Sequence, residues 1–179
     1  PQSVFPAQQN HVPVRLKNTM QPEAEGTIIS DYSDGTGIKA IAAKDDITAI
    51  KIKSGRMLLA YGFLRKVFEV FEIYKTSIDM ITTSEVAVSL TIDNNKNIAE
   101  ITQELEKFGQ VEIDESLTII CIVGDLVAES KGLALTIFDA LKNIPVRMIS
   151  YGGSTHNISV LIKTENKKEA LNALHKKLF

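Results

Sequence analysis

The sequence predicts an α+β protein that contains the same small module twice. The segment Ile47–Lys53 (ITAIKIK) returns as Leu117–Val123 (LTIICIV), and Gly62–Phe71 returns as Gly132–Leu141, both about 70 residues later. Each copy reads as an apolar strand, a helix that begins at a glycine, and two further strands. A repeat of this length indicates two modules built on one plan. The first copy reads β-α-β-β-α-β, which is the ferredoxin-like order of an antiparallel sheet with helices on one face.

The elements of the first module follow from their apolar patterns. Phe63, Leu64, Val67, Phe68 and Phe71 form a stripe on one face of an amphipathic helix. The short apolar runs between turn residues predict strands. In chain order, the module contains strand Ile47–Lys53, helix Gly62–Lys75, strands Ile78–Thr83 and Val86–Asp93, helix Asn97–Phe108 and strand Gln110–Glu115.

The second module repeats this order but lacks a closing strand. It contains a strand at Leu117–Val123, a helix at Lys131–Lys142, strands around Val146–Ile149 and Ile158–Ile162, and a last helix at Lys167–Phe179. A spare strand, Gly37–Asp45, lies before the first module and can fill the gap. We therefore expect the first module to be inserted into the second.

The first 30 residues predict a different body. Val12–Asn18 is a strand candidate with no partner nearby in the sequence, and a single strand is not stable alone. We interpret residues 1–30 as the tail of an upstream domain with a linker at Gln21–Thr27. The turn-rich segment Asp31–Gly37 predicts an exposed loop.

Composition excludes several classes of protein. A net charge of −2 and a pI near 6.0 provide no general attraction to nucleic acid or to an anionic membrane. No apolar run approaches the ~18–20 residues that span a bilayer. The single cysteine, Cys121, excludes an internal disulfide, fits a reducing compartment and is expected to be buried. His11, His156 and His175 lie far apart without metal-ligand spacing, so we expect no metal site.

Two functions of ferredoxin-like folds are also disfavoured. RNA recognition motifs stack bases on aromatic residues of the open sheet face, and the predicted strands of the first module carry none. An acylphosphatase needs an arginine in a phosphate-binding loop, and Arg56 is the only candidate after the first strand. The glycine-rich segment Ser150–Asn157 (SYGGSTHN) lacks the G-K-[ST] of a phosphate loop.

Three motifs carry a family resemblance. ITTSEV at Ile81–Val86, SYGGSTHN at Ser150–Asn157 and N-T-x-x-P-x-x-x-G-T at Asn18–Thr27 occur together and in order. With them the whole chain resembles the regulatory region of aspartate kinases, most closely the lysine-sensitive single-function type. That region consists of two interlocked ACT modules, here residues 47–115 and residues 37–46 plus 116–179. The resemblance implies a cytoplasmic homodimer joined through these modules and attached to its own kinase domain.

The resemblance implies no catalytic activity for this chain. The family phosphorylates the side-chain carboxylate of aspartate with ATP, using a lysine- and glycine-rich strand that is absent from this sequence. We therefore expect no catalytic residue and no cofactor in this chain, with ATP and Mg²⁺ bound only by the kinase domain.

The first module contains groups suited to an amino-acid effector. The helix start at Gly62, Phe63 and Leu64 offers backbone N–H groups to a carboxylate, and Asp79 offers an acceptor for the ammonium, provided that it lies beside that start. Ser84 and Glu85 are available for the second ammonium of lysine. By resemblance, the lysine-contacting positions are Met57, Ala60, Gly62, Phe63, Leu64, Ile78, Asp79, Ser84 and Glu85.

The second module differs at these positions. Arg147 stands where the first module has Asp79, and Gly152–Gly153 stands where it has Ser84–Glu85. A cation there should repel a ligand ammonium. We therefore expect the second module to be structural and to reach a partner subunit through Ser154–Asn157. Two alternatives remain open: a scaffold for dimerisation that binds no ligand, and a sensor of threonine or another amino acid.

Overall fold

The computed structural model describes residues 2–32, 37–55, 61–125 and 129–179. The chain divides into two compact units, Pro1–Thr36 and Gly37–Phe179. None of the described helices is long and apolar enough to cross a membrane.

The N-terminal unit is small and its apolar side chains are exposed. It contains the 3₁₀ helix η1 (Gln2–Val4), helix α1 (Phe5–Gln9) and an antiparallel pair of strands, β1 (Val14–Leu16) and β2 (Thr27–Ile29). The expectation that the first strand has no nearby partner is wrong, because β2 pairs with it and only ten residues, 17–26, lie between the two strands. The exposed apolar side chains of this unit include Phe5, Leu16, Met20 and Tyr32.

The larger unit is built on two long strands that run antiparallel along their whole length. β3 (Ile38–Lys53) pairs with β6 (Gln110–Gly124), in a six-stranded sheet of order β4-β5-β3-β6-β8-β7. The sequence predicted two strands in each of these places. In β3 and in β6 the two predicted strands join into one continuous strand. The pairing of β3 with β6 shifts register at the junction, where Asp46 (φ 59°) and Ser116 (φ 57°) have positive φ.

The outer strands divide the sheet into two modules. β5 (Ala87–Ile92) pairs with the second half of β3, and β4 (Ile81–Thr83) pairs with β5. β8 (Asn157–Lys163) pairs with the second half of β6, and β7 (Val146–Ser150) pairs with β8. Ile38–Lys44 of β3 therefore closes the sheet of the second module against β6. The predicted insertion of the first module into the second is confirmed.

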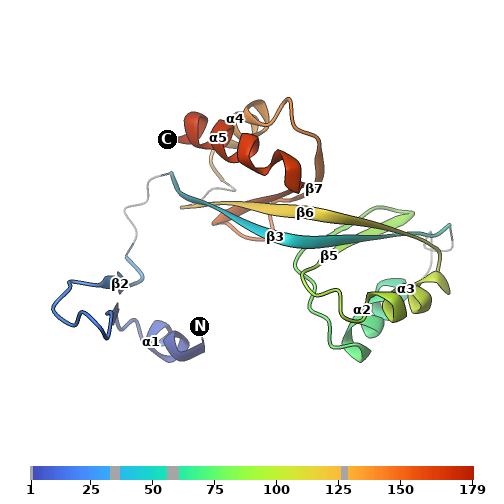
Figure 1. Ribbon diagram of the computed structural model, residues 1–179, viewed down its shortest axis with the longest axis horizontal. Coiled ribbons are helices and arrows are strands. Elements are labelled where there is room, and N and C mark those ends of the chain that lie inside the picture. Colours follow the sequence, from blue (N-terminus) through green and yellow to red (C-terminus); the bar gives the residue numbers. More distant parts are fainter. Residues whose placement is uncertain (1, 33–36, 56–60, 126–128) are drawn as a thin grey trace. The chain divides into compact units, whose positions relative to one another are not determined.

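Two pairs of helices cover opposite ends of the long strands (Figure 1). The first pair is α2 (Phe63–Ile73) with α3 (Ile98–Glu106), and the second is α4 (Leu133–Ala140) with α5 (Lys167–Leu178), which follows the 3₁₀ helix η2 (Thr164–Asn166). Each pair buries an aliphatic core against its own half of the sheet. The first core is centred on Ile50, Ile52, Val67, Leu90 and Leu105; the second is centred on Ile120, Ile122, Ile137, Val160 and Leu174.

A third cluster joins the modules. It contains Ile47, Met80, Leu117, Ile119, Met148 and Leu161, all buried. Along β3 and β6 these side chains alternate with those that face the helices, so the cluster lies on the helix-free face of the sheet. The edge strands β4 and β7 lie close to one another here. Cys121 lies on β6 and is half-buried rather than fully buried as predicted.

Candidate functional site

The start of α2 has no side-chain cap among the described residues. Gly62 precedes the helix with φ 79° in the left-handed region. Among the residues that the structure describes, none would lie within 4 Å of a Cβ at Gly62, and these residues leave room for a ligand at the first N–H groups. The Phe63 ring is buried and lies edge-on to Phe108 with 6.5 Å between ring centroids. Phe63 can therefore contribute only its backbone to a ligand.

The turn that carries Ser84 and Glu85 lies at the same end of the first module as the α2 start. The Ser84 N–H donates to the Ala87 carbonyl (2.8 Å), and the Ser54 N–H, just after β3, donates to the Val86 carbonyl (2.9 Å). Phe108, which packs on Phe63, comes just before the β6 residues that pair with this end of β3. Met57 and Ala60, two further predicted contacts, lie outside the described residues, as does Arg56.

Asp79 lies at the opposite end of the edge strand. Its N–H donates to the carbonyl of Thr91 (2.9 Å), which pairs with Ala49 near the centre of the sheet. Ser84 comes five residues after Asp79, a span of roughly 17 Å in extended chain at 3.4 Å per residue. The C-terminal end of α2 is on Asp79's side, since the Asn97 amide donates to the Tyr74 carbonyl (2.9 Å). The expectation that Asp79 lies beside the start of α2 is therefore wrong within one chain.

Asp79 is paired with a lysine of its own chain. Its carboxylate accepts a hydrogen bond from Lys44 Nζ at 2.9 Å, and the same ammonium lies 2.8 Å from Asp93. The hydrogen bond to Asp79, followed by that to Asp93, raises the pKa of Lys44, and Lys44 in turn lowers the pKa of Asp93. Lys44 belongs to the part of β3 that pairs in the second module. The cluster thus links the modules and carries one net negative charge. Ile78, beside it, is half-buried against the first core.

The second module holds the same arrangement with every charge inverted. Arg147 Nε lies 3.7 Å from Asp114, and Lys163 pairs with the same carboxylate. By the repeat, Asp114 corresponds to Lys44, Arg147 to Asp79 and Lys163 to Asp93, at offsets of 70, 68 and 70 residues. Of these charged residues, Asp79 and Arg147 are identified from the sequence alone. Applying the same offset to every charged residue would have found the other members.

The two helix starts, by contrast, are alike. Gly132 precedes α4 with φ 79° and without a side-chain cap, as Gly62 does for α2. The modules therefore differ in their charges rather than in the backbone that would receive a carboxylate.

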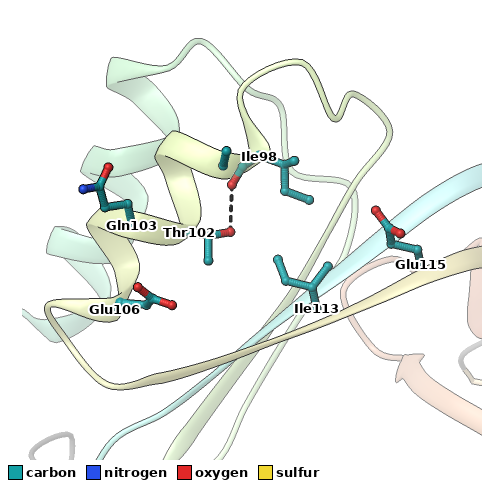
Figure 2. Close-up of a pocket in the computed structure, with 7 residues that line it drawn as sticks. Ile98, Thr102, Gln103, Glu106, Ile113 and Glu115 are labelled. Atoms are coloured by element: carbon teal, nitrogen blue, oxygen red, sulfur yellow. Dashed lines mark hydrogen bonds between the residues drawn. The ribbon is translucent and has the colours of Figure 1, made fainter.

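A separate groove lies on the far edge of the first module (Figure 2). It has a volume of about 570 Å³ and lies between α3 and the first half of β6. Figure 2 shows that the Thr102 hydroxyl donates to the Ile98 carbonyl (2.7 Å) and is held within its own helix. Glu106 and Glu115 are the charged residues of the lining, and none of the predicted site residues belongs to it. Among the described residues, no group of three His, Cys, Asp or Glu side chains could hold a metal ion.

Comparison with known proteins decides the family. The model of the ACT domain family matches residues 120–178. A solved structure from Porphyromonas gingivalis W83, assigned as a C-terminal regulatory domain of aspartate kinase, is 55% identical in sequence with a TM-score of 0.71, over 78% of this chain and 96% of that chain. This chain belongs to the regulatory regions of the aspartate kinase family.

Full-length relatives extend beyond this regulatory region. Aspartokinase 1 of Arabidopsis thaliana, a chloroplast protein, is 38% identical over all of this chain and 34% of its own length. Lysine-sensitive aspartokinase 3 of Escherichia coli K12 is 30% identical over all of this chain and 42% of its own length. The structure of E. coli aspartokinase III with lysine and aspartate aligns over 100% of this chain and 42% of that chain, with 30% identity and a TM-score of 0.88. The chain thus spans about a third to two-fifths of these relatives, and their catalytic domain lies outside it.

Proposed function

We propose that this chain is the lysine-binding regulatory region of an aspartate kinase. The kinase domain of that enzyme would transfer a phosphoryl group from ATP to the side-chain carboxylate of aspartate, with ATP and Mg²⁺ bound there. Lysine bound to this region would inhibit that reaction. Support comes from the E. coli relative, whose structure was solved with lysine and aspartate. That structure matches the fold of this chain over all of this chain.

The observation that carries the proposal is the separation of the two halves of the predicted site. An open helix start and the Ser84–Glu85 turn lie at one end of the first module, and the anionic cluster of Asp79 and Asp93 lies at the other. Lysine needs donors for its carboxylate and acceptors for two ammonium groups. One chain does not bring all of these together.

A two-fold dimer along β4 would complete the site. In such a dimer the same surface meets itself in reverse direction, so that Asp79 of one copy approaches the Gly62 helix start of the other. An edge strand also has unpaired backbone groups that favour addition of a second chain. The elements on this side present apolar surface: Phe68 and Ile73 on α2 and Ile81 on β4 are 39%, 66% and 38% exposed. We propose a homodimer with lysine bound at this interface.

Calorimetry and light scattering on the 179-residue chain test both parts of the proposal. We expect lysine to bind with one site per chain, and a dimer at micromolar concentration. Threonine and methionine should bind far more weakly, because neither has the second ammonium. A chain that stays monomeric with lysine, or that prefers threonine, would contradict the proposal.

One observation favours a second function, a scaffold for dimerisation that binds no effector. Asp79 already accepts a hydrogen bond from Lys44, so its charge is satisfied without a ligand. Absence of binding by lysine, threonine and methionine, together with a stable dimer, would establish this alternative.

The N-terminal unit provides the connection to catalysis. Leu16 and Met20 of this unit are 63% and 87% exposed, and we propose that they pack on the kinase domain. Residues 21–37 would transmit the effect of lysine, since they join the two units covalently. In the intact enzyme, Glu85→Ala should relieve inhibition by lysine and leave uninhibited turnover close to normal. A parallel loss of uninhibited turnover would assign Glu85 a structural role instead.

A further inference from the structure

A charged cavity lies at the junction of the two modules, on the helix-free face of the first module's part of the six-stranded sheet. It has a volume of about 190 Å³ and is lined by Ala49, Lys51, Ser89, Glu112, Asp114, Arg147, Met148 and Leu161. The floor comes from β3, β5 and β6 of the first module, and the cover comes from β7 and β8 of the second. Neither Asp79 nor the start of α2 belongs to it, so it is distinct from the proposed lysine site.

A small residue on the floor makes room for the cavity. Ala49 is the repeat equivalent of Ile119, which lies 70 residues later and is buried in the cluster between the modules. Ser89, opposite Lys51 in the sheet register, adds a second small side chain to the floor. Met148 and Leu161 are buried and form an apolar wall. The space therefore results from one substitution between the copies, and an isoleucine at position 49 would fill it.

The charges around this cavity favour an anion. Lys51 and Arg147 line it, together with the carboxylates of Glu112 and Asp114. Two further cations neutralise those carboxylates from outside, since Lys53 pairs with Glu112 and Lys163 pairs with Asp114. Four cations against two carboxylates leave two positive charges in this group. Lys53 also lowers the pKa of Glu112, which keeps that carboxylate ionised.

We propose that this cavity binds a small acidic amino acid, of the size of aspartate or glutamate. The two carboxylates of such a ligand would meet Arg147 and Lys51, and its ammonium would meet Asp114 or Glu112. Guanidinium groups bind carboxylates through paired hydrogen bonds, and the apolar wall strengthens these contacts by excluding water. The volume lies below the ~300–1,000 Å³ of sites for larger ligands, so only a molecule of a few carbons fits. Lysine, with a net positive charge, is repelled.

Titration of the 179-residue chain with L-aspartate and L-glutamate tests this site. Binding of either one to the wild-type chain is expected. Ala49→Ile should weaken it about tenfold or more by filling the space, and Lys51→Met should do the same by removing a charge-assisted contact. Circular dichroism verifies that both variants fold, and the Lys51 variant keeps the test valid if the isoleucine is not accommodated.

Two controls distinguish this cavity from the proposed lysine site and from a nonspecific anion site. Titration of the same variants with lysine should give wild-type affinity. If lysine binds to no form of the chain, the proposed lysine site is refuted, whereas binding of aspartate or glutamate still supports the cavity. Inorganic phosphate should compete poorly with aspartate. The proposal is overturned if neither acidic amino acid binds, if Ala49→Ile and Lys51→Met bind as well as the wild type, or if phosphate competes equally and marks an adventitious anion only.

Discussion

The two modules share a backbone and differ in the sign of their charges. In the first, Lys44 lies between Asp79 and Asp93; in the second, Asp114 pairs with Arg147 and Lys163. The side chains in these pairs are 25–47% exposed, and exposed ion pairs contribute at most about 1 kcal/mol each. Either sign therefore supports the fold about equally well. These positions can therefore differ in charge without loss of the fold, and they are anionic around Asp79 and cationic around Arg147.

The largest effect is expected from a substitution in the cluster between the modules, which tests whether the two modules unfold together. Leu117 is fully buried between them, and Leu117→Ala should lower the free energy of unfolding by about 2–5 kcal/mol. Because β3 and β6 run through both modules, both should unfold in one transition, as urea titration followed by circular dichroism would show.

Leu135→Ala is the matched control, since Leu135 lies on α4 and is 75% exposed. It should change the free energy of unfolding by no more than about 0.5 kcal/mol. Two separate transitions in the Leu117 variant would show that the modules unfold independently and would contradict this prediction.

The next test addresses ligand selection. Asp79→Ala removes the proposed charge-assisted partner of the lysine ammonium, an interaction worth about 1.5–3 kcal/mol, and should weaken lysine binding about 10- to 150-fold in calorimetry. Arg147→Ala, at the equivalent position, should leave lysine affinity unchanged. Equal effects of the two substitutions would mean that the charge difference does not select the ligand.

A smaller effect is expected from the internal partner of Asp79. Lys44→Met removes the ammonium that occupies this carboxylate, so lysine should bind up to about fivefold more tightly, in keeping with the ~1 kcal/mol limit for an exposed pair. Asp114→Asn provides the control at the equivalent position and should leave lysine affinity as it is. Weaker lysine binding in the Lys44 variant would show that Lys44 orients Asp79 rather than competing for it.

The smallest effect is expected on the stability of the protein at low pH. The Thr118 hydroxyl donates to Asp45 (2.8 Å), whereas its equivalent Thr48 accepts from the neutral amide of Asn95 (2.8 Å). Hydrogen bonds from Lys167, at the start of α5, and then from Thr118 lower the pKa of Asp45 below its ordinary 3.8. A lowered pKa means that this stabilisation is complete above pH 3.8 and is lost as the pH falls through the folded-state value.

Thermal melts between pH 6 and pH 2 check this difference between the modules. The melting temperature of the wild type should fall below about pH 4, and Asp45→Asn should make that fall shallower by removing one titrating group. Asn95→Ala should leave the slope unchanged, since no charge is involved. An identical acid response in the wild type and the Asp45 variant would refute a role for this carboxylate.

Much of the fold follows from sequence patterns because its signals are local. The apolar stripe of α2 and the spacing of the repeat predict the helices, the strands and the insertion. The continuity of β3 does not follow from the sequence pattern, because Asp46 separates the predicted strands Gly37–Asp45 and Ile47–Lys53, whereas the chain accommodates Asp46 at positive φ. The pairing of β1 with β2 was missed because β2 has only three residues.

The site was less predictable, since it depends on contacts between distant segments. Sequence identified Asp79 but placed it beside the wrong end of α2, because the direction of the strand after the helix was not considered. Lys44 was missed because it lies in the other module's part of β3. The cavity at Ala49 depends on what β7 places above it, and no pattern in β3 alone contains that information.

The long strands β3 and β6 belong to both copies of the repeat. Each long strand begins in one module and ends in the other, which is the connectivity of two copies that have exchanged a strand and been fused into a single chain. Each copy therefore completes the sheet of its neighbour, so that the fold is maintained while the two copies carry opposite charges.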